Sequence, residues 1–208
     1  MRFPVTLLLA VSLVAPGAAA QNLLVSPDFD VATDVDDWPD PFPDPDTTIS
    51  WQSDLDVDGA PDSGSLRLDN SISNGASDGP RQCVVAGPGF YEMEAFFYNP
   101  TQTPQPVAQI FLEYFPSADC TGAGIGFAGE TGPGTLDAWD SVFLLEEAPD
   151  GTASIGVRIS SGGTTDPTPH VVFYDAVFLP EPGRLPAGAC GLVALAFLVR
   201  RRAFSLSR

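Results

Sequence analysis

The chain of 208 residues contains no lysine, one histidine and three cysteines, and its nine basic residues are all arginines. They stand against 27 acidic residues, which leaves a net charge of −18. A protein this acidic repels phosphate backbones, so the composition argues against nucleic-acid binding. The sequence has no H-E-x-x-H motif, no glycine-rich phosphate loop and no ordered Ser, His and Asp set. Nothing in it therefore indicates an enzyme.

Helical patterning is also missing, and what the chain has instead is typical of strands. There are 20 glycines and 21 prolines, too many helix breakers for a helical protein. With 44% hydrophobic residues, however, the chain has enough apolar material to bury a core. The composition favours short strands joined by turns.

The first 20 residues have the pattern of a secretory signal peptide. Arg2 precedes an apolar run over residues 5–14, and Ala18 and Ala20 form an A-x-A cleavage site before Gln21. We therefore expect cleavage between Ala20 and Gln21 by signal peptidase, and a mature chain outside the cytoplasm.

The last 28 residues, 181–208, are predicted to form a sorting segment. The apolar stretch 185–199 would cover only about 22 Å as a helix, short of a bilayer core of about 30 Å. It follows Pro180, Glu181 and Pro182 and meets a cluster of arginines, Arg200, Arg201 and Arg202. Pro-Glu-Pro, a short hydrophobic helix and arginines in this order resemble the PEP-CTERM sorting signal of Gram-negative bacteria. That resemblance implies transient inner-membrane anchoring and an exosortase-like processing enzyme. A plain membrane anchor is the alternative.

Residues 21–180 are predicted to form one all-β domain. Ile155, Val157 and Ile159 alternate with Ser154, Gly156, Arg158 and Ser160, as in a half-buried strand. A two-sheet antiparallel β-sandwich would bury one face of each sheet. We expect about nine strands, at 23–25, 48–51, 65–69, 82–86, 90–98, 107–115, 140–145, 154–160 and 171–179.

Short motifs stand at the two ends of this domain: Asn22-Leu23-Leu24 with Asp28-Phe29-Asp30 at the start, and Val172-Phe173-Tyr174-Asp175-Ala176-Val177 at the close. In this order they resemble the jelly-roll carbohydrate-binding modules and the wider galactose-binding-like sandwiches. It implies polysaccharide binding, and a structural calcium ion between the first and last strands with Asp30 and Asp175 as donors.

A second possible calcium site lies at Asp54, Asp56 and Asp58, followed by Gly59. Alternating carboxylates before a glycine form the first half of an EF-hand-like loop. Position twelve of such a loop would be Ser65 rather than glutamate, so a full EF-hand is excluded. A looser calcium loop or a solvated acidic turn remains. The proline-rich segment 34–46 is expected to be a loop without chemistry.

Cys83 and Cys120 are expected to form a disulfide in an oxidising exterior, with two separate buried thiols as the alternative. Sugar rings stack on flat aromatic side chains, so Trp38, Tyr98 and Trp139, each beside a polar loop, are the candidate ligand-binding residues. His170 follows Pro169 at a strand entrance and is expected at the surface.

We therefore expect a secreted, non-catalytic sandwich that binds extracellular polysaccharide. The alternatives are a matrix protein whose acids mediate calcium-dependent cohesion and, with least support, a glycan hydrolase.

Overall fold

The computed structural model describes residues 21–43, 45–70, 79–103, 105–162 and 169–182. The expected signal peptide, the hydrophobic segment 185–199 and Arg200, Arg201 and Arg202 lie outside these residues. Within the described ranges, no helix is both long and apolar enough to span a membrane.

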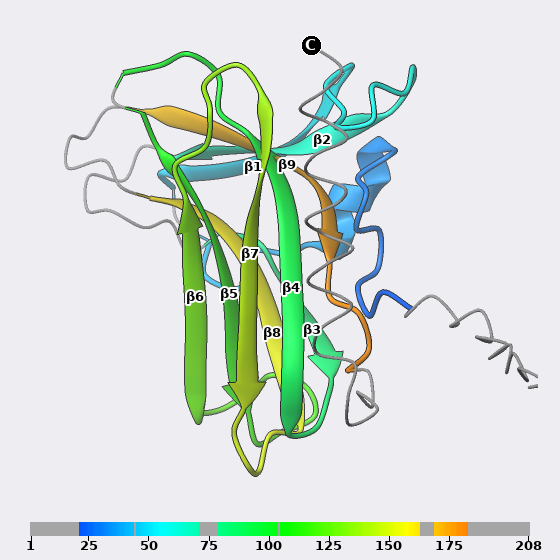
Figure 1. Cartoon of the computed structure of the whole chain (residues 1–208), viewed down its shortest axis with the longest axis vertical. Coiled ribbons are helices and arrows are strands. Elements are labelled where there is room, and N and C mark those ends of the chain that lie inside the picture. The colour runs from blue at the N-terminus through cyan, green and yellow to red at the C-terminus, as the bar shows by residue number, and fades with distance from the viewer. Residues whose placement is uncertain (1–20, 44, 71–78, 104, 163–168, 183–208) are drawn as a thin grey trace, which may run out of the picture.

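The described residues form two antiparallel sheets packed face to face (Figure 1). The larger sheet has the order β1-β2-β9-β4-β7, and the smaller has the order β3-β8-β5-β6. A jelly-roll β-sandwich, the fold class predicted from the sequence, is thereby confirmed. The elements are the 3-10 helix η1 (Ala32–Asp37), β1 (Thr47–Ser53), β2 (Gly64–Asn70), β3 (Arg81–Val85), β4 (Gly89–Tyr98), β5 (Val107–Phe115), β6 (Gly126–Gly132), β7 (Trp139–Ala148), β8 (Ser154–Gly162) and β9 (His170–Phe178).

Strand alternation explains the core. The inward residues of β8, Ile155, Val157 and Ile159, are fully buried, as their spacing predicts. Full burial of each such side chain contributes about 2 kcal/mol to folding. The same period of two places Leu66 and Leu68 of β2 in the core, together with Met93, Ile110, Leu112 and Val172.

One predicted strand is absent, and one observed strand was not predicted. Residues 23–25 form no strand, and this segment contributes only an isolated bridge between Asn22 and Pro180. Conversely, β6 was not predicted, because Gly126, Gly129 and Gly132 give it the composition of a turn. The number of strands is nevertheless nine among the described residues. The segment expected as a loop from residue 34 begins inside η1.

The two ends of the sandwich lie side by side, the N-terminal segment (blue) beside the end of β9 (orange) in Figure 1. The Leu23 amide donates to the Leu179 carbonyl at 2.8 Å, and the Glu181 amide donates to the Gln21 carbonyl at 3.0 Å. The Asn22 side chain donates to the Val177 carbonyl at 2.8 Å. The expected cut before Gln21 and the Pro-Glu-Pro motif therefore occupy neighbouring positions.

The expected disulfide between Cys83 and Cys120 is present, with the two Cα atoms 5.8 Å apart. It joins β3 to the loop that follows β5. Closing a loop with a sequence separation of 37 residues stabilises the folded state by about 4 kcal/mol in the chain-entropy treatment.

Candidate functional site

The outer face of the four-stranded sheet carries a polar and aromatic surface, which we call the arginine face. Because outward residues recur at every second position, the strand register places them in rows. One row contains Arg81, Arg158 and Phe111. The next contains Glu113 and Phe127, which are directly paired. The arginine face comprises Arg81, Gln109, Phe111, Glu113, Phe127 and Arg158.

Glu113 lies between two arginines and fixes both. Its Oε2 accepts from Arg81 Nη1 at 2.9 Å, and its Oε1 accepts from Arg158 Nη2 at 3.0 Å. The three side chains are only 15–18% exposed. The Arg158 guanidinium lies 4.6 Å from the centre of the Phe111 ring, and that of Arg81 lies 5.4 Å from the Phe115 ring. Rings and ion pairs together hold these donors in one orientation.

Two glycines make room for this arrangement. A Cβ atom at Gly129 would lie 2.4 Å from the Phe111 ring, so the ring occupies the space above β6. A Cβ atom at Gly156 would lie 2.9 Å from the Arg81 side chain and 3.3 Å from Glu113 Oε2. The missing side chains thus allow Arg81 and Glu113 to meet across β8. Of the three glycines in β6, Gly129 is therefore part of the site.

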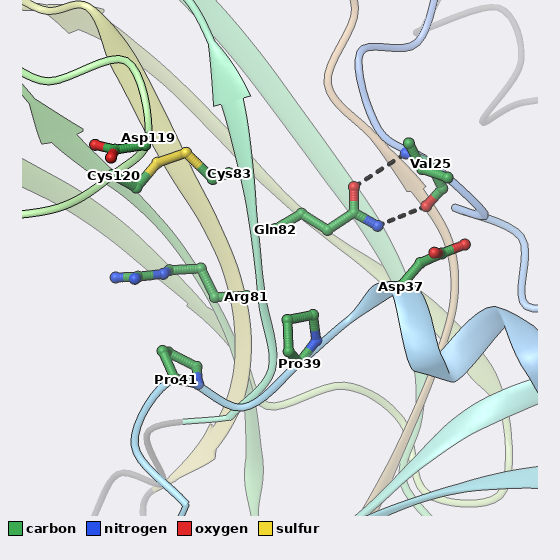
Figure 2. Close-up of a pocket in the computed structure, with 9 residues that line it drawn as sticks. All are labelled: Val25, Asp37, Pro39, Pro41, Arg81, Gln82, Cys83, Asp119 and Cys120. Carbon is green, nitrogen blue, oxygen red and sulfur yellow. Dashed lines mark hydrogen bonds between the residues drawn. A yellow bond between two sulfur atoms is a disulfide. The ribbon is translucent and has the colours of Figure 1, made fainter.

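A hollow of about 320 Å³ opens beside the arginine face at the β3 edge (Figure 2). Figure 2 shows Arg81 and Gln82 leaving β3 in opposite directions, with the disulfide above them. The Gln82 amide accepts from the Val25 amide at 3.0 Å and donates to the Val25 carbonyl at 2.6 Å. The Gln82 side chain therefore holds the N-terminal segment at Val25 against the wall of the hollow. Asp37 and Asp119 also line it.

The arginine face is not among the sites predicted from the sequence. Part of this surface could nevertheless have been predicted. The alternation in residues 154–160 places Arg158 outward, and the same period in residues 107–115 places Phe111 and Glu113 on one side. What the sequence does not show is which strands are neighbours. Only the register brings Arg81 and Arg158 to the same carboxylate.

Two predicted aromatic residues, Tyr98 and Trp139, meet on the outer face of the other sheet. Their ring centres are 5.7 Å apart, and the Phe173 ring is 6.1 Å from Tyr98. The Arg67 guanidinium lies 5.9 Å from the centre of Phe173. We call Arg67, Phe173, Tyr98 and Trp139 the aromatic row, because the register aligns them across β2, β9, β4 and β7.

The expectations for Trp38 and His170 are wrong. Trp38 is 1% exposed, its ring centre is 5.5 Å from that of Phe29, and its Nε1 donates to the Ser26 carbonyl. It is a core residue and cannot contact a ligand, although polar residues flank it in the sequence. His170 is also 1% exposed, and its Nε2 hydrogen bonds to the Ser161 hydroxyl at 3.0 Å.

The two predicted calcium sites lie together in the structure. The Val57 amide, from the Asp54–Asp58 segment, donates to Asp175 Oδ2 at 2.9 Å. Ser63 donates through its hydroxyl to Asp30 Oδ1 at 2.8 Å. Partial burial, followed by repulsion from Asp30 and Asp58, raises the pKa of Asp28. We call this group the acidic cluster: Asp28, Asp30, Asp56, Asp58 and Asp175.

Asp175 is the buried member of the acidic cluster, with 1% exposure. Burial, and then repulsion from Asp56 and Asp28, raises its pKa to about 7. Asp54 is exposed on a left-handed backbone with φ 61°. In the described part of the chain, no three Asp, Glu, His or Cys side chains are arranged to hold a metal ion by themselves. Main-chain carbonyls and water would have to complete any coordination shell.

Comparison with known proteins supports the fold but not a family. No protein-family model and no curated protein matches the sequence. Among solved structures, the CBM22-1 xylan-binding domain of Paenibacillus barcinonensis Xyn10C is 16% identical, with a TM-score of 0.52 over 79% of this chain and 96% of that domain. A sugar-binding protein of Bacteroides thetaiotaomicron, described as putative, is 14% identical, with a TM-score of 0.52 over 77% of this chain and all of that protein.

A third similar structure belongs to a larger protein. The enzymatically active domain of bacteriophage CBA120 tailspike protein 4 is 12% identical, with a TM-score of 0.57 over 76% of this chain. This chain spans only 21% of that one. At such identities the likeness shows that the fold is a sandwich like those of carbohydrate-binding modules.

Proposed function

We propose that this protein is a non-catalytic polysaccharide-binding module and that the arginine face is its binding site. The observation that carries the proposal is the convergence of Arg81, Glu113 and Arg158 beside the Phe111 and Phe127 rings. This surface lies on the outside of a sheet, so an extended polymer has access to it.

The chemistry of the arginine face suits a sugar chain. Phe127 is 76% exposed and can stack on the apolar face of a pyranose ring. Guanidinium groups donate hydrogen bonds and the carboxylate of Glu113 accepts them, which matches the hydroxyl groups of a sugar. The side chains are already held by ion pairs and rings, so little ordering entropy opposes binding. The similarity in fold to a xylan-binding domain is consistent with this proposal.

Affinity gel electrophoresis tests the proposal with the polysaccharides xylan, galactomannan, mixed-linkage glucan and alginate in native gels. We expect at least one to retard the protein, and Phe127→Ala to weaken that retardation at least fivefold. Phe90→Ala is the matched control, since Phe90 is 56% exposed on the other sheet and should leave retardation unchanged.

The same experiment separates the alternatives. Mobility unchanged in every gel, together with calcium-dependent self-association, would favour a matrix protein over a polysaccharide-binding module. Release of reducing ends from a bound polysaccharide would instead indicate a hydrolase.

A calcium ion at the acidic cluster is a second part of the proposal. Calcium binds six to eight hard oxygen atoms, and carboxylates are suitable ligands. The observation in favour is geometric: the Val57 amide donates to the buried Asp175 carboxylate at 2.9 Å, which brings the Asp54–Asp58 segment against the end of β9. Burial, and then repulsion from Asp56 and Asp28, raises the pKa of Asp175 in the same place. Asp175 and its neighbour Asp56 would supply carboxylate oxygens, and main-chain carbonyls and water would complete the coordination shell. A bound cation there would hold the Asp54–Asp58 segment against β9.

We also propose that the chain is secreted and sorted to the cell surface of a Gram-negative bacterium through signal peptidase and an exosortase-like enzyme. Support comes from the sequence patterns at residues 1–20 and 180–202. Cell fractionation tests this proposal, with retention in the inner membrane expected when Pro180, Glu181 and Pro182 are all replaced by alanine.

A further inference from the structure

We infer that the aromatic row is a second binding site for pyranose polysaccharide, so that the protein cross-links two polymer chains. This inference rests on the proposed function of the arginine face and goes beyond it, because it changes the role from attachment to bridging.

The aromatic row crosses the five-stranded sheet in one line. Arg67 is paired with Phe173, Phe173 with Tyr98, and Tyr98 with Trp139. The rings are tilted by 58–68° against one another, and the Arg67 guanidinium continues the line at 5.9 Å from Phe173. Phe173 is buried beneath its neighbours, with 8% exposure. Tyr98 and Trp139 are half-buried and form the accessible end.

The aromatic row repeats the chemistry of the arginine face. Arg67 Nε and Nη2 donate to the two Asp69 carboxylate oxygens, both at 2.8 Å. An arginine paired with a carboxylate therefore lies over a phenylalanine ring on both sheets: Arg67, Asp69 and Phe173 here, and Arg158, Glu113 and Phe111 on the other side. All three arginines among the described residues belong to these two surfaces, although the chain is strongly acidic.

Further aromatic surface extends from the aromatic row along β7. Outward positions recur at every second residue, so Ser141 and Phe143 follow Trp139 on the same side. Phe143 is 43% exposed and lies about 14 Å from Trp139 along an extended strand. The Asp137 carboxylate lies beside Tyr98 and provides hydrogen-bond acceptors for a sugar. The Thr101 amide and hydroxyl donate to this carboxylate and hold it in place. These hydrogen bonds lower the pKa of Asp137 and keep it ionised.

The geometry of the sandwich makes the two surfaces independent. Its sheets are packed face to face, about 10 Å apart, so the two outer faces point in opposite directions. A single extended sugar chain cannot lie on both faces at once. Occupation of both surfaces therefore joins two chains.

A bridging assay tests this inference with the full mature protein. Beads carrying immobilised xylan are mixed with protein and then with soluble fluorescent xylan, and the other three polysaccharides are used in the same way. We expect fluorescence to be captured by the wild type, while Trp139→Ala reduces capture at least tenfold and leaves retention of the protein itself on the beads within threefold of wild type. Phe90→Ala on the same sheet is the control and should capture normally.

The outcomes distinguish this inference from the proposed function. If the wild type is retained on the beads but captures no fluorescence, and Phe127→Ala abolishes retention, the second site is overturned. The arginine face then stays as the binding site. No retention on any of the four polysaccharides overturns both. A circular dichroism melt of Trp139→Ala within 3 °C of wild type establishes that the loss of bridging is not a loss of folding.

Discussion

Glu113 has the largest structural role among the charged residues of the site, because two arginines depend on it. Glu113→Gln would leave both guanidinium groups facing a neutral partner at sites that are only 15% exposed. Charged hydrogen bonds of this kind contribute about 1.5–3 kcal/mol. We expect Glu113→Gln to lower the free energy of unfolding by about 2 kcal/mol, measured by urea denaturation.

Asp69→Asn is the matched control for Glu113→Gln. Its carboxylate also pairs with an arginine, at 2.8 Å, but the two side chains are 36–38% exposed. Exposed ion pairs contribute about 0–1 kcal/mol, so this variant should be close to wild type in stability. Equal losses for the two variants would contradict the special position of Glu113.

Individual residues also show where sequence reasoning succeeds. The disulfide follows from the two cysteines of residues 21–180, and the inward side of residues 154–160 follows from simple alternation. Trp38 shows where such reasoning fails. Its polar neighbours in the chain suggested exposure, but the turn after η1 directs the indole inward to Phe29.

At the scale of the element, β6 illustrates a strand that sequence patterns cannot reveal. Its glycines have a low strand propensity. They are needed because side chains from β5 and from the opposite sheet occupy the space that a Cβ atom would fill. Phe111 lies above Gly129, and Phe97 lies within 3 Å of the Cβ position of Gly132. The strand forms because β5 offers it a full register of partners from Ala108 to Tyr114.

Gly129→Ala tests this explanation of β6. The new methyl group would lie 2.4 Å from the Phe111 ring and force it to move. Such overpacking costs about 1–3 kcal/mol. We expect that loss in urea denaturation, together with weaker retardation in the polysaccharide gels, since the displaced ring belongs to the arginine face. Gly87→Ala is the control, because nothing lies within 4 Å of its Cβ position. Unchanged stability and retention in Gly129→Ala would contradict the assignment.

Across the whole molecule, the excess of acidic residues makes stability depend on pH. The pKa of Asp175 rises from 3.8 to about 7 on folding. At a pH between these two values, Asp175 keeps its proton in the folded state and has lost it in the unfolded state. The contribution of Asp175 to stability is therefore present at low pH and is lost as the pH rises towards 7.

Wild type and Asp175→Asn are compared first in EDTA, which removes calcium. The stability of wild type relative to the variant should fall as the pH is raised from 4 to 7, measured by urea denaturation. Saturating calcium at pH 7 should raise the melting temperature of wild type but not of the variant, because only the native carboxylates bind the ion. A melting temperature of wild type that does not respond to calcium would rule out the calcium site.

The topology of the whole molecule is the feature that is hardest to predict from the sequence. Strand positions and the sandwich class follow from alternation and composition, but the order β3-β8-β5-β6 joins residues far apart in the chain. Arg81 and Glu113 are separated by 32 residues, and no local pattern links them. The arginine face therefore results from strand register, and it is separate from the aromatic row because the two lie on different sheets.

The arginine face is tested most directly by an NMR titration of the ¹⁵N-labelled domain of residues 21–180 with xylohexaose and with oligosaccharides of the other three polysaccharides. For at least one of them, the largest amide shift changes should fall on Phe111, Glu113, Phe127 and Arg158. If no oligosaccharide shifts these amides, or if the changes are confined to Phe90 and Phe178, the arginine face is not a polysaccharide-binding site.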